Sequence, residues 1–159
     1  MKQFVLSRTG FWIITARIVW LLALAGPAAN FALLILSALA IRGGMILGIL
    51  RPPESASFTH ITEAAVPGVA GFAATFLSIL FVLNLLLGTF NLLPVPPLDG
   101  NTGVTLLMSE ESALRFLDWT RNQGFGMAGL LLAWVLYDKV FDFIFRVSLA
   151  ALYPGSHWG

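Results

Sequence analysis

Asp99 is the residue with the clearest chemical potential in this sequence, because it ends a long run without charge. No ionisable side chain occurs between Ala64 and Leu98. An acidic residue at membrane depth is costly to bury, and such residues mark metal, proton or substrate sites. The alternative is structural: Asp99 lies at the membrane surface and caps the helix that begins after it. Position alone does not separate these two interpretations.

Few other residues offer chemistry. Cys is absent, which excludes thiol nucleophiles, disulfides and thiolate ligands, so oxygen or imidazole would have to bind any metal. His60 and His157 have no second histidine at helical spacing, and we interpret them as loop and tail residues. A late charged cluster could form a relay, but we favour a group of snorkelling interfacial residues, of which Asp142 and Arg146 are spaced to pair on one helix face. This cluster comprises Asp138, Lys139, Asp142 and Arg146.

Composition places these residues in a membrane. The chain has 159 residues, of which 58% are hydrophobic and 11% are charged, and the mean hydropathy is +0.87. Soluble domains carry about a quarter charged residues, so this chain has too little polar surface for a water-soluble globule. A net charge of +1 provides no basic face, which excludes nucleic acid as a main partner. The expected surroundings are the lipid bilayer.

The charge-free runs predict an all-α, polytopic integral membrane protein with a single domain, 1–159. A helix needs about 20 apolar residues to cross a bilayer. We expect about three spans, at 18–41, 66–88 and 124–152. The third either continues as a helix to about residue 152 or bends into an amphipathic segment, because its uncharged part ends at Tyr137.

The segments outside the spans set the orientation and the loops. Three basic residues and no acidic residue precede the first span, so the positive-inside rule places the N-terminus in the cytoplasm. Residues 45–50 are apolar but too short to span, which favours a turn or a dip into the interface. Residues 101–123 mix charged and apolar side chains, and we expect a short helix and loop at the surface.

A proline-rich segment, 91–100, follows the second span and reads Asn-Leu-Leu-Pro-Val-Pro-Pro-Leu-Asp-Gly. Three prolines in four positions remove backbone donors and disfavour helix before them. The helix of about 69–87 must therefore end or break near membrane depth. Irregular backbone is tolerated there only when it is buried in protein or lines a wet cavity.

This segment closely resembles the Asn-x-x-Pro-x-x-x-x-Asp-Gly signature of site-2 proteases, which are intramembrane zinc metalloproteases. A second element, Gly-Pro-Ala-Ala-Asn at 26–30, resembles the Gly-Pro-x-x-Asn element on the helix between the family's two zinc-binding segments. The order and separation of the two elements also fit. The resemblance covers about 21–103, and it implies the later part of such a protease core.

The resemblance implies roles for the residues of the proline-rich segment. Asp99 would be the third protein ligand of a catalytic zinc, beside two histidines of an H-E-x-x-H helix whose glutamate activates the zinc-bound water. Asn91 would lie near the substrate or the active-site backbone. Pro94 and Pro97 would help to hold the backbone open for an extended peptide, and Gly100 would let the chain turn tightly past the metal.

The resemblance also implies roles within the first span. Gly26 and Pro27 would kink that helix so that Asn30 hydrogen-bonds to a neighbouring segment. Asn84 matches no motif, and we expect it to form a hydrogen bond between helices. Asn101 is a small departure, since many relatives have a second glycine there.

The larger departure is that no H-E-x-x-H occurs in the 159 residues. Relatives carry that helix before the Gly-Pro-x-x-Asn helix, where only 1–17 stand here, so we expect a missing catalytic segment rather than a mutated one. One aspartate does not hold zinc against water. The chain is therefore expected to be inactive alone, with no catalytic residue of its own, unless an upstream stretch or a complementing chain supplies the rest.

Three functions remain open from the sequence. The first is membership of the intramembrane zinc metalloprotease family, which hydrolyses peptide bonds of transmembrane segments. The second is a catalytically dead relative that binds or regulates a membrane partner. The third is a path for a small solute or ion through Asp99, which would need a second ionisable residue in the first two spans, and the sequence has none there.

Overall fold

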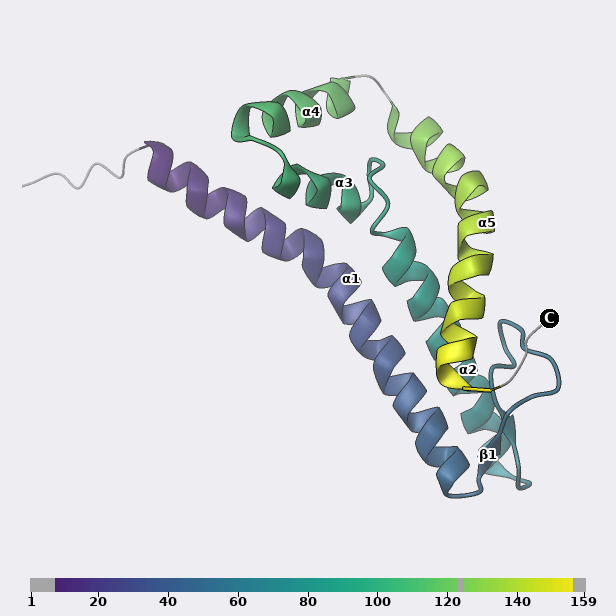
Figure 1. Cartoon of the computed structure of the whole chain (residues 1–159). Helices are drawn as coiled ribbons and strands as arrows, with labels where there is room; N and C mark the ends of the chain where they lie inside the picture. The colour runs from purple at the N-terminus through teal and green to yellow at the C-terminus, as the bar shows by residue number, and fades with distance from the viewer. Residues whose placement is uncertain (1–7, 123–124, 156–159) are drawn as a thin grey trace, which may run out of the picture.

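A computed structural model describes residues 8–122 and 125–155, and it is mostly helical (Figure 1). Two strands of two residues each interrupt the helices, so the all-α prediction holds for the architecture but not for the connecting region. The elements in chain order are α1 (Arg8–Ile46), β1 (Leu50–Arg51), β2 (Glu63–Ala64), α2 (Val69–Phe90), α3 (Asp99–Gly103), the 3-10 helix η1 (Val104–Leu107), α4 (Glu110–Asn122) and α5 (Phe125–Leu152).

Two helical stretches of the described chain are long and apolar enough to cross a membrane. They are Leu24–Ile46 in α1 and Val69–Phe90, which is the whole of α2. At 1.5 Å per residue, 22 residues extend about 33 Å, which matches the hydrocarbon core of a bilayer. The start of α2 at Val69 agrees with the helix of about 69–87 predicted from the sequence. The helix ends at Phe90, just before the proline-rich segment, where backbone N–H donors are lost.

The helix α5 runs without a break from Phe125 to Leu152. Of the two courses that the sequence left open after Tyr137, the continued helix is the one observed. Asp142 and Arg146, whose spacing would allow an ion pair on one face of α5, are both exposed and make no ion pair within the described residues. The four charged residues of the late cluster are all exposed, which fits solvated or snorkelling side chains better than a relay.

The packing of α1 against α2 is the most extensive contact between elements, and α5 covers another side of α2 (Figure 1). The main core joins the C-terminal half of α1, the middle of α2 and the end of α5. Small residues let the first two helices approach closely: a Cβ added at Gly88 would lie 3.3 Å from the Cβ of Asn30. The buried side chains of this core are Ile41, Ile61, Phe81, Val82, Leu85, Leu149, Leu152 and Tyr153.

The connecting region closes the end of the molecule where α1 stops and α2 starts. After α1 the chain turns at Gly48, which has a φ of 70°, and β1 then pairs antiparallel with β2. The turn expected at 45–50 is therefore observed at residues 47–49, and the strand pairing that follows it was not expected. The guanidinium of Arg51 lies 3.2 Å from the carboxylate of Glu63, and the Thr62 hydroxyl donates to the Arg51 carbonyl over 3.0 Å.

A single serine of α2 anchors this region. The Ser78 hydroxyl accepts the backbone N–H groups of Ile61 at 2.9 Å and Thr62 at 3.2 Å, and it donates to the Ala74 carbonyl at 2.8 Å. Asn84, two turns further along α2, differs from its prediction. Its amide donates to the Leu80 carbonyl of its own helix over 2.7 Å, and no hydrogen bond joins it to another helix within the described residues.

Candidate functional site

The candidate site begins where α2 ends, at the proline-rich segment. The backbone N–H of Asn91 continues the helical pattern by donating to the Leu87 carbonyl over 3.0 Å. The Asn91 carbonyl then accepts the N–H of Gly100 over 2.6 Å. The first and last residues of the segment are thus joined, and the residues between them form a closed loop. The structure uses the backbone of Asn91 here, and it gives no hydrogen bond to its side chain within the described residues.

The loop is held by turns rather than by a helix. The N–H of Val95 donates to the Leu93 carbonyl and the N–H of Leu98 to the Val95 carbonyl, each over 2.8 Å. The bond between Pro96 and Pro97 is cis. Pro94 and Pro97, the two prolines assigned to keep the backbone open, are both exposed. The segment is therefore irregular, as its prolines predict, and both of these rings lie at its surface.

The helix α5 packs against this loop. A Cβ added at Gly129 would lie 3.1 Å from a methyl carbon of Val95. Phe90 at the end of α2 stacks edge-on against Tyr137, with ring centroids 5.1 Å apart, and Leu93, Val95 and Leu98 pack on the same cluster. The loop thus packs against one side of α5.

A close backbone approach explains Gly100. The residue is buried, and a Cβ added there would lie 2.2 Å from the Leu92 carbonyl oxygen and 2.5 Å from the Leu93 oxygen. Both are backbone atoms, so no side-chain movement relieves the clash. Gly100 is not among the described glycines with a positive φ. The tight turn therefore depends on the absence of a side chain, not on a left-handed backbone.

Asp99 is the first residue of α3, and its carboxylate lies over α1. The N-cap of α3 is Leu98, and no side chain caps this helix, so Asp99 does not cap a helix that starts after it. A Cβ added at Gly26 would lie 3.0 Å from the Asp99 Oδ2 atom. Asp99 is half-buried and makes no hydrogen bond or ion pair with the described part of the chain.

The α1 side of the site comes from the Gly-Pro-Ala-Ala-Asn element. Pro27 is a buried residue inside α1, and α1 bends along its length (Figure 1). Asn30 lies one turn after Gly26 and packs on Gly88. The side chain of Asn30 makes no hydrogen bond to any described residue, so the expected bond to a neighbouring segment is not observed there.

Asn101 is a feature of the site that sequence reasoning noted only as a departure. Its side chain is 8% exposed, and its Oδ1 atom is the one buried side-chain acceptor of the described residues without a partner. Glycine at this position, as in many site-2 proteases, has no such acceptor. A buried acceptor two residues from Asp99 adds a polar atom that only a donor could satisfy.

Thr89 and Tyr137 also went unrecognised in the sequence. The Thr89 hydroxyl donates to the Leu85 carbonyl over 2.5 Å and forms a short hydrogen bond with the Tyr137 hydroxyl. These two side chains connect the last turn of α2 to α5 directly before the proline-rich loop. The only signal in the sequence was a hydroxyl in an apolar run, at Thr89, one residue before the end of α2.

The described residues do not assemble a metal centre. They contain no group of three His, Cys, Asp or Glu side chains that could share a metal ion. His60 belongs to the connecting region at the opposite end of α2, where its Nδ1 contacts the Thr59 hydroxyl at 2.8 Å. About 33 Å of helix separates that end from Asp99. His157 lies outside the described residues.

The site therefore unites the two sequence elements but offers one possible metal ligand. It consists of the Asp99 carboxylate, which has no partner among the described residues and lies against Gly26 of α1, a loop closed between Asn91 and Gly100, and the packing of α5 against that loop. Comparisons of the chain with protein-family models, curated proteins and solved structures give no match.

Proposed function

We propose that this chain is a membrane protein that carries the aspartate half of a site-2-protease-like zinc peptidase site and is inactive alone. The observation that carries the proposal is the meeting of Asp99 with Gly26. These residues belong to two separate sequence elements, and both elements resemble the same family. If the two motifs resembled the family by chance, nothing would require the Asp99 side chain to lie against the backbone of Gly26.

The placement of Asp99 also suits a ligand role. Its carboxylate makes no hydrogen bond or ion pair to a described residue, and it projects beside a helix position without a Cβ. Catalytic zinc takes three protein ligands and one open position for water, and when bound it activates that water for hydrolysis. Asp99 is one ligand of three, so the donor set of the described residues is incomplete and does not fit zinc by itself. No hydrolytic step follows from this chain alone.

The remaining parts of the proposal concern the surroundings. The protein crosses the membrane several times, with α5 as a third span and the N-terminus in the cytoplasm. The H-E-x-x-H helix comes from another segment or a complementing chain and contacts the face of α1 around Gly26. Ala28 and Ala29 on this part of α1 are exposed, which leaves room for such a helix. The substrate is a transmembrane segment of another protein.

A photo-crosslinking experiment tests where the missing helix docks. A crosslinking amino acid replaces Ala29, and a matched control variant carries it at Ile46, which is 86% exposed at the other end of the apolar helix. In native membranes we expect Ala29, but not Ile46, to crosslink to a chain that carries H-E-x-x-H. Crosslinks from Ala29 only to chains without that motif would contradict the peptidase proposal.

That second outcome would favour the other candidate, a membrane binding or regulatory module without hydrolysis. The incomplete donor set of the described residues is the observation in its favour. Zinc content separates the two candidates further. We expect little zinc in the purified chain alone and near-stoichiometric zinc in the complex. Asp99→Asn should abolish zinc binding in the complex without affecting membrane insertion. The control Asp118→Asn changes an exposed carboxylate on α4 and should leave the zinc content unchanged.

A further inference from the structure

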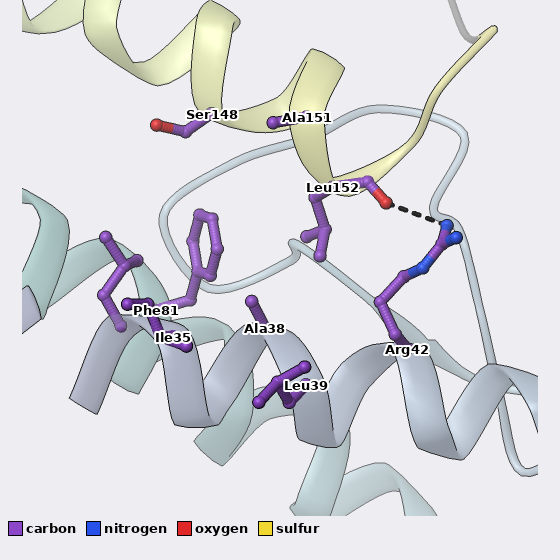
Figure 2. A pocket seen from close by; sticks show the side chains of 9 residues that line it. Ile35, Ala38, Leu39, Arg42, Phe81, Ser148, Ala151 and Leu152 are labelled. Carbon is purple, nitrogen blue, oxygen red and sulfur yellow. Dashed lines mark hydrogen bonds between the residues drawn. The ribbon is translucent and has the colours of Figure 1, made fainter. Parts of the chain in front are cut away.

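A groove of about 280 Å³ lies between α1, α2 and α5, away from Asp99 (Figure 2). Its walls are apolar: Ile35, Ala38 and Leu39 of α1 and Ala151 of α5 line it, and the Phe81 ring of α2 lies between the two helices. Ile35 is 58% exposed and Leu39 is 63% exposed. Both belong to the apolar stretch of α1 that is long enough to span a bilayer, so the groove opens toward hydrocarbon.

One end of the groove carries a positive charge. Among the described residues that line it, Arg42 alone is ionisable, and its Nη1 atom donates to the Leu152 carbonyl over 3.1 Å (Figure 2). That carbonyl is neutral, so the contact orients the guanidinium without cancelling its charge. The group has five N–H donors, and no carboxylate pairs with it within the described residues. Donors therefore remain for a second, charged partner.

The position of Arg42 along α1 defines what that partner is. Arg42 lies one turn before Ile46, the end of the apolar stretch, so its head group reaches the level of the lipid phosphates while Ile35 and Leu39 lie at the level of the acyl chains. A cavity near 300 Å³ is at the lower limit for small-molecule sites, which suits one acyl chain better than a bulky ring system.

We propose that this groove binds an anionic phospholipid. One acyl chain lies along Ile35, Leu39 and Ala151, and the headgroup phosphate accepts hydrogen bonds from Arg42. A zwitterionic lipid offers the same phosphate but adds a cationic group, and no acidic side chain lines the groove to receive it. The proposal rests on the membrane placement of α1 and not on the peptidase-like site, so failure of one does not affect the other.

Native mass spectrometry of the full chain tests this proposal. The protein in mild detergent is mixed with phosphatidylglycerol or with phosphatidylcholine of the same acyl chains. We expect phosphatidylglycerol to be retained about fivefold better, which is the effect of one arginine near an anionic lipid. Glycerol phosphate, which has no acyl chain, should not displace it. Equal retention of the two lipids, or displacement by glycerol phosphate, would overturn the proposal.

Variants locate the site. Arg42→Gln should lower phosphatidylglycerol retention to the phosphatidylcholine level, while Arg146→Gln, which changes an exposed arginine of α5 outside the groove, should not. Arg42→Gln also removes the contact with Leu152, so a second variant is needed. Ala151→Trp keeps Arg42 and fills the groove from an exposed position, and it should also abolish the preference. A folded Ala151→Trp variant that still prefers phosphatidylglycerol as strongly as the wild type would refute the site. If both variants misfold, the comparison of the two lipids on the wild-type chain still tests the proposal.

Discussion

The carboxylate of Asp99 and the backbone of Gly26 occupy adjoining space: a Cβ built on Gly26 lies 3.0 Å from the Asp99 Oδ2 atom. This relationship joins α1 to the start of α3. A side chain at position 26 would require the Asp99 carboxylate to shift by a few tenths of an ångström. The two residues therefore should respond together to mutation, which gives a direct test of the site geometry.

Gly26→Ala should not stabilise α1, whereas Gly43→Ala in the same helix should. Alanine is favoured over glycine in a helix interior by about 1 kcal/mol. At Gly43 a Cβ meets no atom within 4 Å, so Gly43→Ala should raise the melting temperature in detergent. At Gly26 the new methyl forces the Asp99 carboxylate to move, which cancels the gain.

A double-mutant cycle separates the contact from other effects at Gly26. Combining Gly26→Ala with Asp99→Ala should restore the stabilisation that Gly43→Ala shows, because the opposing carboxylate is gone. If the change in melting temperature of the double variant equals the sum of the changes in the two single variants, the residues do not interact.

Gly100→Ala should be among the more damaging single methyl additions in this chain. The new Cβ would lie 2.2 Å from the Leu92 carbonyl oxygen, so backbone must shift, and we expect a loss of about 1–3 kcal/mol. Limited proteolysis should then cut within 91–100. Gly71→Ala is the control, since a Cβ at Gly71 meets no atom within 4 Å. Equal protease resistance of the two variants would contradict the close approach at Leu92.

Ser78→Ala should loosen the connecting region. It leaves the buried N–H groups of Ile61 and Thr62 without their acceptor, at a cost of about 1–3 kcal/mol for each group. Hydrogen exchange at these two amides should accelerate. Ser37→Ala is a matched control, because the buried Ser37 hydroxyl bonds only to the Leu34 carbonyl of its own helix. Unchanged exchange at Ile61 in Ser78→Ala would exclude the anchoring role.

Tyr153 should make the same region sensitive to alkaline pH. Its hydroxyl is buried and donates to the Ile61 carbonyl over 2.7 Å, and burial raises its pKa above the ordinary 10.0, opposed by the Thr62 side chain and the charge of Arg42. The folded state then keeps a proton that the unfolded state releases. The contribution to stability is complete below pH 10 and is lost as the pH rises above it.

The Tyr153→Phe variant tests that direction. It should be less stable than the wild type at neutral pH, because the bond to Ile61 is lost, but its melting temperature should fall less steeply above about pH 10. Parallel declines for the two proteins in that range would show that Tyr153 does not titrate with unfolding.

Much of the helical architecture follows from the sequence alone. Long runs without charge require their backbone polar groups to bond within the helix, so the spans at 18–41 and 66–88 are predictable from composition. The structure carries the first helix past Arg42 to Ile46 and gives the second as Val69–Phe90. The end of α2 is predictable because three prolines follow it. The short pairing of β1 with β2 was not predictable, since strands of two residues leave no periodic pattern in the sequence.

The site divides in the same way. The types and spacing of Asn91, Asp99 and Gly100 are properties of the sequence, and they marked a candidate site whose chemistry stays a prediction. Only the tertiary structure decided that Asp99 lies on Gly26, that Gly100 is fitted against Leu92, and that Asn101 is buried without a partner. The physical reason is that covalent geometry and hydropathy act locally along the chain. Which atoms adjoin across helices depends on how their surfaces pack, and a sequence pattern does not record that.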